Sequence, residues 1–208
     1  MKSKTVRNIL IIICILIILF SLFQIVRIML EYRAGSSTYD ELNQVSVTVE
    51  NIPEQDKNAD HAGVMVQPEN IVIWPKINFA KLQEINPDII AWLYSEGTII
   101  SYPVAHTDNN DYYLNHTWKH NQSAIGSIFL ECQNRPDFTE YNTIVYGHNL
   151  VTNPAMFTGL RQYEDPEFWK EHPSVYILNQ EGIYRYDIFA AYNTGVRTIV
   201  YGLSITKD

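Results

Sequence analysis

Cysteine is scarce in this sequence, and its positions exclude a fold held together by an internal disulfide. Cys14 lies in an uncharged apolar run near the N-terminus, whereas Cys132 lies far along the chain. No Cys follows position 132. Disulfide-rich secreted domains pair their cysteines. This chain must therefore rely on a hydrophobic core, for which its 46% hydrophobic residues are sufficient.

Positive charge is also scarce beyond the N-terminal region. The chain has 15 Lys and Arg residues against 23 Asp and Glu residues, and five of the basic residues but only one acidic residue lie in residues 1–33. Residues 34–208 are therefore strongly acidic. Nucleic acid requires a basic protein face, so we expect no nucleic-acid partner. Internal repeats and low-complexity tracts are absent as well.

An uncharged apolar run is the first feature that is present. It extends from Ile9 to Val26, close to the roughly 20 residues that a helix needs to cross a bilayer. No A-x-A-like cleavage site follows it, so we expect a retained signal anchor at residues 9–28. Three basic residues precede the run. The positive-inside rule therefore predicts a cytoplasmic N-terminus at residues 1–8 and an extracellular domain.

Composition divides the remainder into a stalk and a domain. Residues 29–70 are polar and acidic without a sustained apolar period, which predicts a stalk. Residues 71–208 form the predicted domain, which opens with two short helices on either side of Asn86-Pro87. A further helical run is predicted at residues 155–171, with Asp165-Pro166 restarting the next turn as cap and first residue. Strands are predicted at residues 91–94, 98–104, 125–131, 143–146, 174–178 and 183–192. The expected fold is mainly β: a barrel or tightly curled sheet with helical insertions.

His148 is the main candidate for chemistry in this domain. It stands at the exit of the run Thr143–Leu150, which predicts a strand that delivers an imidazole to a surface loop. Gly147 removes a side chain that would crowd a substrate. An unperturbed imidazole titrates near pH 6.5 and suits general acid–base catalysis. A lone imidazole is equally compatible with a structural role.

Two other groups are weaker candidates. Cys132 needs a nearby base or positive group to become reactive, and sixteen residues separate it from His148; an incidental thiol is the alternative. His116 and His120 have the spacing that places two imidazoles on one helical face. The Glu of the zinc-protease signature and an obvious third ligand are missing. We therefore expect no metal and no cofactor.

Five short motifs are specific when they are taken together. They are Ile85-Asn-Pro-Asp-Ile-Ile-Ala-Trp92, Ile100-Ser-Tyr-Pro-Val104, Asp108-Asn-Asn-Asp-Tyr-Tyr-Leu114, Gly126-Ser-Ile-Phe-Leu130 and Tyr146-Gly-His-Asn-Leu150. Together they resemble the class B sortases, which are membrane-anchored cysteine transpeptidases of Gram-positive bacteria. The resemblance runs from about Phe79 to Tyr192. The predicted anchor, orientation and stalk also agree with that family.

The resemblance implies a sortase-type β-barrel and a transpeptidation reaction. In the family, a Cys thiolate cleaves a C-terminal sorting signal of a secreted protein, and the resulting thioester passes to an amine of a peptidoglycan precursor or of another protein. The resemblance makes His148 the catalytic proton donor and acceptor. It also places Asn110, Leu114 and Tyr146 along the substrate groove. Loop polarity for Asn110 and core packing for Leu114 and Tyr146 remain open as alternatives.

The C-terminal end departs from the family pattern. Sortases carry a Thr-Leu-Ser-Thr-Cys-like strand and then an Arg beyond the position of Tyr192, and this chain reaches Asp208 with neither. We therefore expect an incomplete barrel in a partial catalytic domain that is inactive alone, because covalent catalysis needs a nucleophile. Two alternatives remain: a catalytically dead, membrane-anchored barrel that binds peptides or a partner, and a hydrolase that uses Cys132 with His148.

Overall fold

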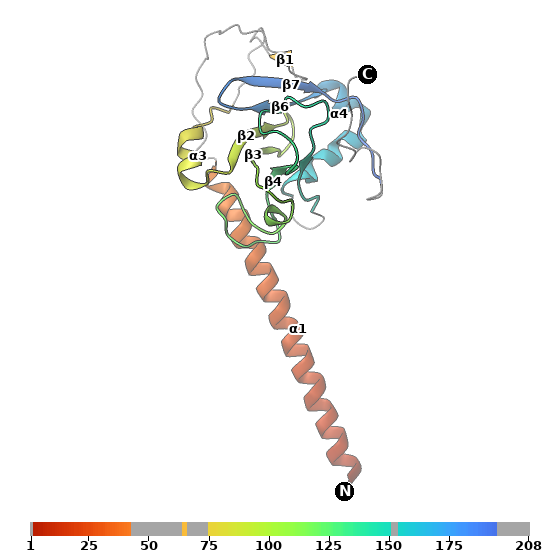
Figure 1. Cartoon of the computed structure of the whole chain (residues 1–208). Helices are drawn as coiled ribbons and strands as arrows, with labels where there is room; N and C mark the ends of the chain where they lie inside the picture. Colours follow the sequence, from red (N-terminus) through yellow and green to blue (C-terminus); the bar gives the residue numbers. More distant parts are fainter. Residues whose placement is uncertain (1, 43–63, 66–74, 151–153, 195–208) are drawn as a thin grey trace.

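The computed structural model describes residues 2–42, 64–65, 75–150 and 154–194. In these residues a long helix leads into a domain built on one mixed sheet (Figure 1). The strand order is β1-β7-β6-β2-β3-β4-β5. Among the strand pairs of the described residues, only β3–β4 is parallel. Within the described residues β1 and β5 end the sheet without pairing to each other, so the sheet is a half-barrel. The predicted mainly β, incomplete barrel is confirmed.

The order of the strands along the chain agrees with the prediction. The helices are α1 Lys2–Asp40, α3 Phe79–Ile85 and α4 Pro166–Glu171, with 3-10 helices η1 Tyr112–Leu114 and η2 Phe157–Glu164. The strands are β1 Val64–Met65, β2 Ile89–Tyr94, β3 Ser101–Ala105, β4 Ile128–Leu130, β5 Val145–Tyr146, β6 Ser174–Leu178 and β7 Ile183–Asp187. The β7 strand ends five residues before the predicted end at Tyr192. The C-terminal tail 195–208 lies outside the described residues.

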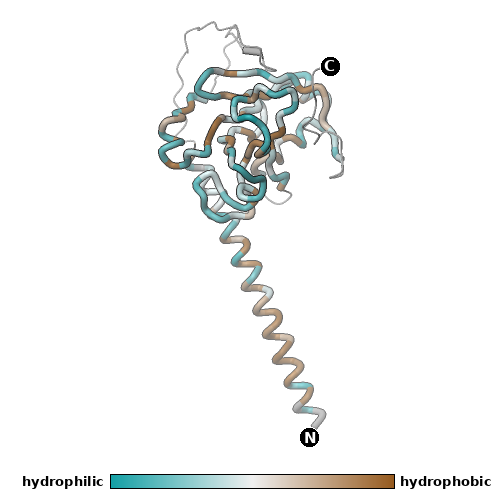
Figure 2. Tube along the Cα trace, viewed as in Figure 1, coloured by the Kyte–Doolittle hydropathy of each residue, from teal (hydrophilic) through white to brown (hydrophobic). Residues whose placement is uncertain are grey.

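Helix α1 carries the apolar run. Its large apolar side chains from Val6 to Leu30 are exposed on all sides, and its length and composition make it a candidate membrane span. Figure 2 shows this apolar character along most of the helix, below a domain of mixed polarity. The helix does not stop at residue 28. It continues to Asp40 and enters the domain.

The predicted stalk at residues 29–70 therefore differs from the structure where it is described. Residues 29–40 continue α1, and Val64 and Met65 form strand β1 against β7. Packing explains the longer helix, because Leu42, two residues beyond its end, is only 2% exposed and lies in the hydrophobic core of the domain. Local polarity indicated a loose chain, but tertiary contacts stabilise a helix there. The other stalk residues lie outside the described part.

Two hydrophobic cores lie on opposite faces of the central strand β2. Ala91 and Leu93 belong to the first core, whereas Ile89 and Trp92 belong to the second. Ile89 and Ala91 are two residues apart but point to opposite faces, and the pairing of β2 with β3 has a register irregularity between them. The first core also contains Ile100, Val104, Ile128 and Ile177, and the second also contains Phe79, Leu82, Trp118, Phe129 and Leu178. A strand buried on both faces reads as a continuous apolar run, which is what β2 has.

Asn86 ends a helix instead of beginning one. The side chain of Asn78 caps the start of α3 by accepting from Lys81 N (3.0 Å), and Asn86 is the residue at its C-terminal end. The buried Asn86 amide donates to the Tyr113 hydroxyl and to the Trp118 carbonyl, each at 2.7 Å. The second predicted helix at Asn86-Pro87 is therefore wrong, because these long-range hydrogen bonds hold a turn that leads directly into β2.

The region predicted as one helical run at residues 155–171 contains two helices. The first is the 3-10 helix η2, and the second, α4, restarts at Asp165 with Pro166 in its first turn, as predicted. The Asp165 carboxylate accepts from Glu167 N at 2.9 Å. Together η2 and α4 connect β5 to β6 and lie beside the loop that follows β5.

Replacement of Leu82 by alanine should destabilise the domain strongly. Leu82 is fully buried (0% exposed) in the second core, and Leu→Ala changes at such sites cost about 2–5 kcal/mol of unfolding free energy. The matched Leu160→Ala removes the same atoms from a side chain that is 40% exposed and should cost about 0.5 kcal/mol. Urea unfolding of the full chain in detergent, followed by tryptophan fluorescence, measures both. Equal losses would contradict the assignment of Leu82 to the core.

Candidate active site

The short strand β5 carries His148 to the surface. β5 pairs antiparallel with β4, with Phe129 opposite Tyr146, and His148 follows two residues beyond its end. The His148 carbonyl accepts from Phe157 N at 2.9 Å. The Leu150 N–H donates to the Thr158 hydroxyl (3.1 Å), and that hydroxyl donates to the Leu150 carbonyl (3.0 Å). The backbone at His148 and after it is thus held against η2, and the backbone before it is held by β4.

The imidazole of His148 makes one short hydrogen bond, to the backbone of η1. Its Nε2 lies 2.6 Å from the carbonyl oxygen of Leu114. A carbonyl can only accept, so Nε2 must carry the proton in this arrangement. The lone pair of the neutral ring then belongs to Nδ1. The ring is partly exposed, so Nδ1 is the nitrogen at which a substrate proton can be taken up or released.

Glycines at positions 126 and 147 allow this close packing. A Cβ on Gly126 would lie 3.0 Å from His148 Cδ2 and 2.7 Å from the Leu114 carbonyl oxygen, and the φ of Gly126 is +63°. A Cβ on Gly147 would collide with the Ile128 side chain and would lie 2.9 Å from Phe157. Gly147 therefore serves internal packing in this structure, whereas the sequence indicated clearance for a substrate.

Asn110 and Tyr146, which the family resemblance places along a substrate groove, meet at one carboxylate. Asn110 Nδ2 donates to Glu131 Oε1 and the Tyr146 hydroxyl donates to Glu131 Oε2, each at 2.7 Å. Glu131 is only 5% exposed. Burial opposes its ionisation, but hydrogen bonds from Asn110, Tyr146, Cys132 and the Gln133 N–H outweigh burial and lower the pKa of Glu131. The structure thus holds a buried, ionised carboxylate at the end of β4.

Cys132 belongs to the same hydrogen-bond network, which makes its thiol less reactive. Its thiol Sγ donates to Glu131 Oε1 at 3.2 Å, and its N–H donates to Asn110 Oδ1 at 2.8 Å. The hydrogen bond to Glu131, together with desolvation and the negative charge, raises the pKa of the Cys132 thiol. A raised pKa keeps the sulfur protonated, which is the opposite of what a nucleophile needs.

Leu114 is placed differently from Asn110 and Tyr146. Its carbonyl holds His148, while 41% of the residue is exposed beside the imidazole. The structure therefore brings Leu114 and His148 together. Asn110 and Tyr146 meet at Glu131, as a separate pair.

His116 and His120 do not lie on a helix. The stretch that contains them is a turn, and His120 has a positive φ of 64°. The ring of Tyr112 stacks on His116 with centroids 4.1 Å apart, and its hydroxyl lies 3.1 Å from His120 Nδ1. The helical face that the sequence indicated for the two imidazoles is thus absent, and both engage Tyr112 instead.

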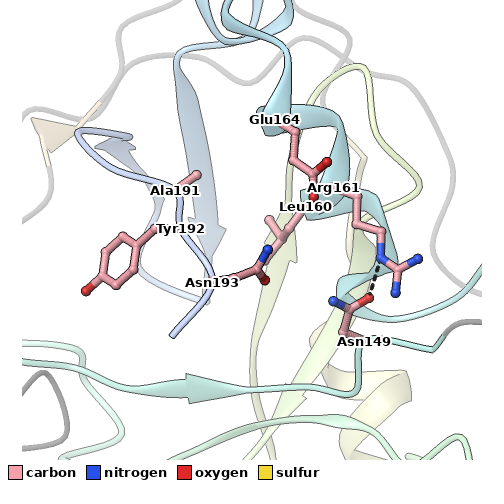
Figure 3. Close-up of a pocket in the computed structure, with 7 residues that line it drawn as sticks. All are labelled: Asn149, Leu160, Arg161, Glu164, Ala191, Tyr192 and Asn193. Atoms are coloured by element: carbon pink, nitrogen blue, oxygen red, sulfur yellow. Dashed lines mark hydrogen bonds between the residues drawn. The ribbon is translucent and has the colours of Figure 1, made fainter. Parts of the chain in front are cut away.

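A polar hollow lies next to the His148 loop (Figure 3). Its volume is about 390 Å³, and its lining residues are Asn149, Leu160, Arg161, Glu164, Ala191, Tyr192 and Asn193. Arg161 Nε donates to Asn149 Oδ1 at 2.9 Å across one side of it. Sequence reasoning did not find this hollow or the role of Glu131, because both join residues far apart in the chain. An acidic residue directly after the apolar β4 run was the one local signal for Glu131.

The chain is similar to two known sortase B proteins. It is 40% identical over 113 residues to sortase B of Listeria monocytogenes, covering 54% of this chain and 46% of the relative. It is 29% identical over 194 residues to sortase B of Staphylococcus aureus, covering 93% of this chain and 72% of the relative. The chain thus spans about half of the length of the Listeria protein. No protein-family model matches the chain.

Known structures agree with these relatives. The structure of sortase B from Listeria monocytogenes superposes with a TM-score of 0.52 and 38% identity, over 57% of this chain and 67% of that one. A Staphylococcus aureus sortase B–substrate complex superposes with a TM-score of 0.54 and 35% identity, over 57% and 54% of the two chains. The fold and the identities agree with the resemblance carried by the five motifs, and the chain belongs to the class B sortase family.

Proposed function

We propose that these 208 residues supply the acid–base part of a class B sortase that cleaves a C-terminal sorting signal and joins the protein to an amine. The observation that carries this proposal is His148, held at the exit of β5 with Nε2 on the Leu114 carbonyl and Nδ1 available. Membership of the sortase family supplies the reaction in which such a group is useful.

The proton inventory of the reaction explains why an imidazole is needed. The attacking thiol first transfers its proton to Nδ1 of His148. The thiolate then attacks the carbonyl carbon of the sorting signal, the C–N bond breaks, and the departing amine takes that proton from His148. The incoming amine later loses a proton to the same ring as the thioester is resolved. An imidazole can act both as a proton donor and as a proton acceptor, so one ring can serve both steps.

The substrates are proposed from relatives and from the exposed residues of the site. A Staphylococcus aureus sortase B has been solved as a substrate complex, and a sortase B has been solved with a triglycine peptide. By analogy, the substrates here are a sorting-signal peptide of a secreted protein and an amine of a peptidoglycan precursor or a protein. Leu114, exposed beside His148, is the proposed peptide contact, and Asn110 and Tyr146 shape the groove through Glu131.

The helix α1 gives the proposed location. Its apolar part is a candidate membrane span, and the basic residues that precede it favour a cytoplasmic N-terminus. The domain is then extracellular, where secreted proteins carrying sorting signals and cell-wall amines are both present.

The nucleophile of the proposed reaction is not among these residues. Cys14 lies within the candidate membrane span, and the thiol of Cys132 is kept protonated by Glu131. The proposal therefore requires a Cys from a longer form of the protein, and the 208 residues alone should form no thioester. The alternative is a membrane-anchored barrel that binds sorting-signal peptides or a partner sortase without cleaving them.

Reading the gene beyond codon 208 and expressing the encoded protein tests the proposal directly. The proposal expects a Cys-bearing strand and a later Arg in the same frame, and a thioester with a sorting-signal peptide that mass spectrometry detects. A stop codon immediately after Asp208 contradicts the transpeptidase proposal. Peptide binding by fluorescence anisotropy without any thioester would then favour the binding alternative.

Replacement of His148 by alanine should abolish most transpeptidation in the longer protein. Loss of a general acid–base group lowers the rate on the order of 10²–10⁴-fold, here in kcat/KM for a sorting-signal peptide and triglycine. The control is His172→Ala, which removes an imidazole at the end of α4. Comparable activity of the His148→Ala protein and the control would remove His148 from the mechanism.

Replacement of Glu131 by glutamine should make Cys132 more reactive. The Glu131 carboxylate raises the pKa of the thiol by accepting its hydrogen bond, so removing the charge should lower the pH at which alkylation accelerates. Iodoacetamide labelling of Cys132 as a function of pH, in a Cys14→Ser background, measures this change by mass spectrometry. Glu164→Gln, on η2, is the control and should leave the profile unchanged. A Cys132 that already reacts rapidly at neutral pH in the unmodified chain would restore the hydrolase alternative.

A further inference from the structure

Tyr39, near the end of α1, contacts the backbone segment that packs against His148. Its hydroxyl lies 2.6 Å from the carbonyl oxygen of Gly126 and 3.0 Å from Ser127 Oγ. The Ser127 hydroxyl donates its single proton to the His116 carbonyl at 2.9 Å, and the single Tyr39 proton goes to the closer acceptor, the Gly126 carbonyl. The Tyr39 proton is therefore directed at the Gly126–Ser127 peptide, 87 residues away in the sequence.

Gly126 in turn lies against the imidazole. A Cβ added to it would be 3.0 Å from His148 Cδ2 and 2.7 Å from the Leu114 carbonyl oxygen that holds His148. The α-carbon of Gly126 thus occupies the space next to the ring and to its hydrogen-bond acceptor. A small movement of this peptide would disturb the ring and its partner together, because close-packed interiors transmit such displacements.

The end of α1 is seated firmly enough to act as a support. A Cβ on Gly35 would collide with Ser123 Oγ, which shows how closely the helix approaches the segment before Gly126. Trp118 Nε1 donates to the Thr38 carbonyl at 3.2 Å. Leu42 is buried in the second core one turn farther on. Contacts therefore fix the helix on both sides of Tyr39.

The ring of Tyr39 is oriented independently of its hydroxyl. It packs edge-on against Tyr102, with centroids 5.5 Å apart and an interplanar angle of 88°, and it contacts both hydrophobic cores. A phenylalanine at this position keeps these ring contacts and loses only the hydrogen bonds to the Gly126–Ser127 peptide. The Tyr39→Phe change therefore separates packing from positioning.

We propose that Tyr39 is a positioning residue for His148, which couples the candidate membrane helix to the acid–base group through the Gly126 peptide. The inference rests on the proposed function only for the catalytic consequence. The mechanical link concerns where the imidazole lies, and it can be measured whether or not His148 takes part in catalysis. In the absence of the Tyr39 hydroxyl, the Gly126 peptide loses a donor and the ring loses part of its support.

Carbethoxylation of His148 by diethylpyrocarbonate tests the link in the full chain in detergent. Donation of Nε2–H to Leu114 leaves only Nδ1 free to react, so loosening should add reaction at Nε2 and raise the total labelling rate of His148, resolved by peptide mass spectrometry. In Tyr39→Phe we expect a rise of roughly fivefold, the factor that corresponds to one hydrogen bond. His172 and His106 serve as internal references and should label at unchanged rates.

Two further variants make the outcome decisive. Tyr32→Phe removes a hydroxyl from the same docked end of α1 and should leave the labelling of His148 unchanged. Gly35→Ala pushes the helix away from Ser123 and should raise the His148 rate, as Tyr39→Phe does. An unchanged His148 rate in both Tyr39→Phe and Gly35→Ala overturns the proposal. A uniform rise at all three histidines also overturns it, because that indicates general loosening of the fold.

Catalysis supplies the last readout and separates this inference from the proposed function. In an active longer protein, Tyr39→Phe should lower kcat and leave KM for the peptide nearly unchanged. If His148→Ala proves harmless while Tyr39→Phe still raises the labelling of His148, the positioning link holds and the catalytic assignment fails. If His148→Ala abolishes activity while Tyr39→Phe changes neither labelling nor kcat, the catalytic assignment holds and the link fails.

Discussion

Burial of β2 on both faces is the constraint on which the domain depends. Ala91 and Leu93 need one apolar layer and Trp92 needs another, and a strand can satisfy both only in the centre of a sheet that is covered on each side. The layer over Trp92 is completed by α3 and by the end of α1, through Leu82 and Leu42. The helix that carries the apolar run is therefore part of the folded domain, and the positions of η1 and β5 follow from the same packing.

Polar groups complete what the two cores begin. Asn86 ties the turn before β2 to Tyr113 and to the Trp118 carbonyl, while Glu131 gathers Asn110, Tyr146 and Cys132 at the end of β4. Buried polar groups that are fully hydrogen-bonded specify one arrangement among several that apolar packing would allow. These two networks hold the backbone segments that meet around His148, namely η1, the end of β4 and the exit of β5.

Sequence patterns predicted the elements whose signals are local. The strand at residues 174–178 was found with its exact bounds, and Asp165-Pro166 marked the start of α4, because turn and capping chemistry lies within a few residues. The strand that ends just before His148 was predicted for the same reason, through the run Thr143–Leu150. Asn86 was misread as a helix start because its partners lie 27 and 32 residues away. The docking of Tyr39 and the carboxylate network at Glu131 depend on comparable long-range contacts, which no local pattern reports.

The continuity of α1 also limits how far the candidate active site can move relative to the apolar part of the helix. At 1.5 Å per residue, the nine residues from Leu30 to Tyr39 span about 14 Å along the helix axis. A flexible linker would let the domain sample a wide range of distances from a bilayer. A helix packed into the domain would instead hold the His148 imidazole at a nearly constant height above the bilayer and in a nearly constant orientation, if α1 spans the membrane as proposed. With α1 as the proposed membrane anchor, the domain would act at a nearly constant distance from the membrane surface.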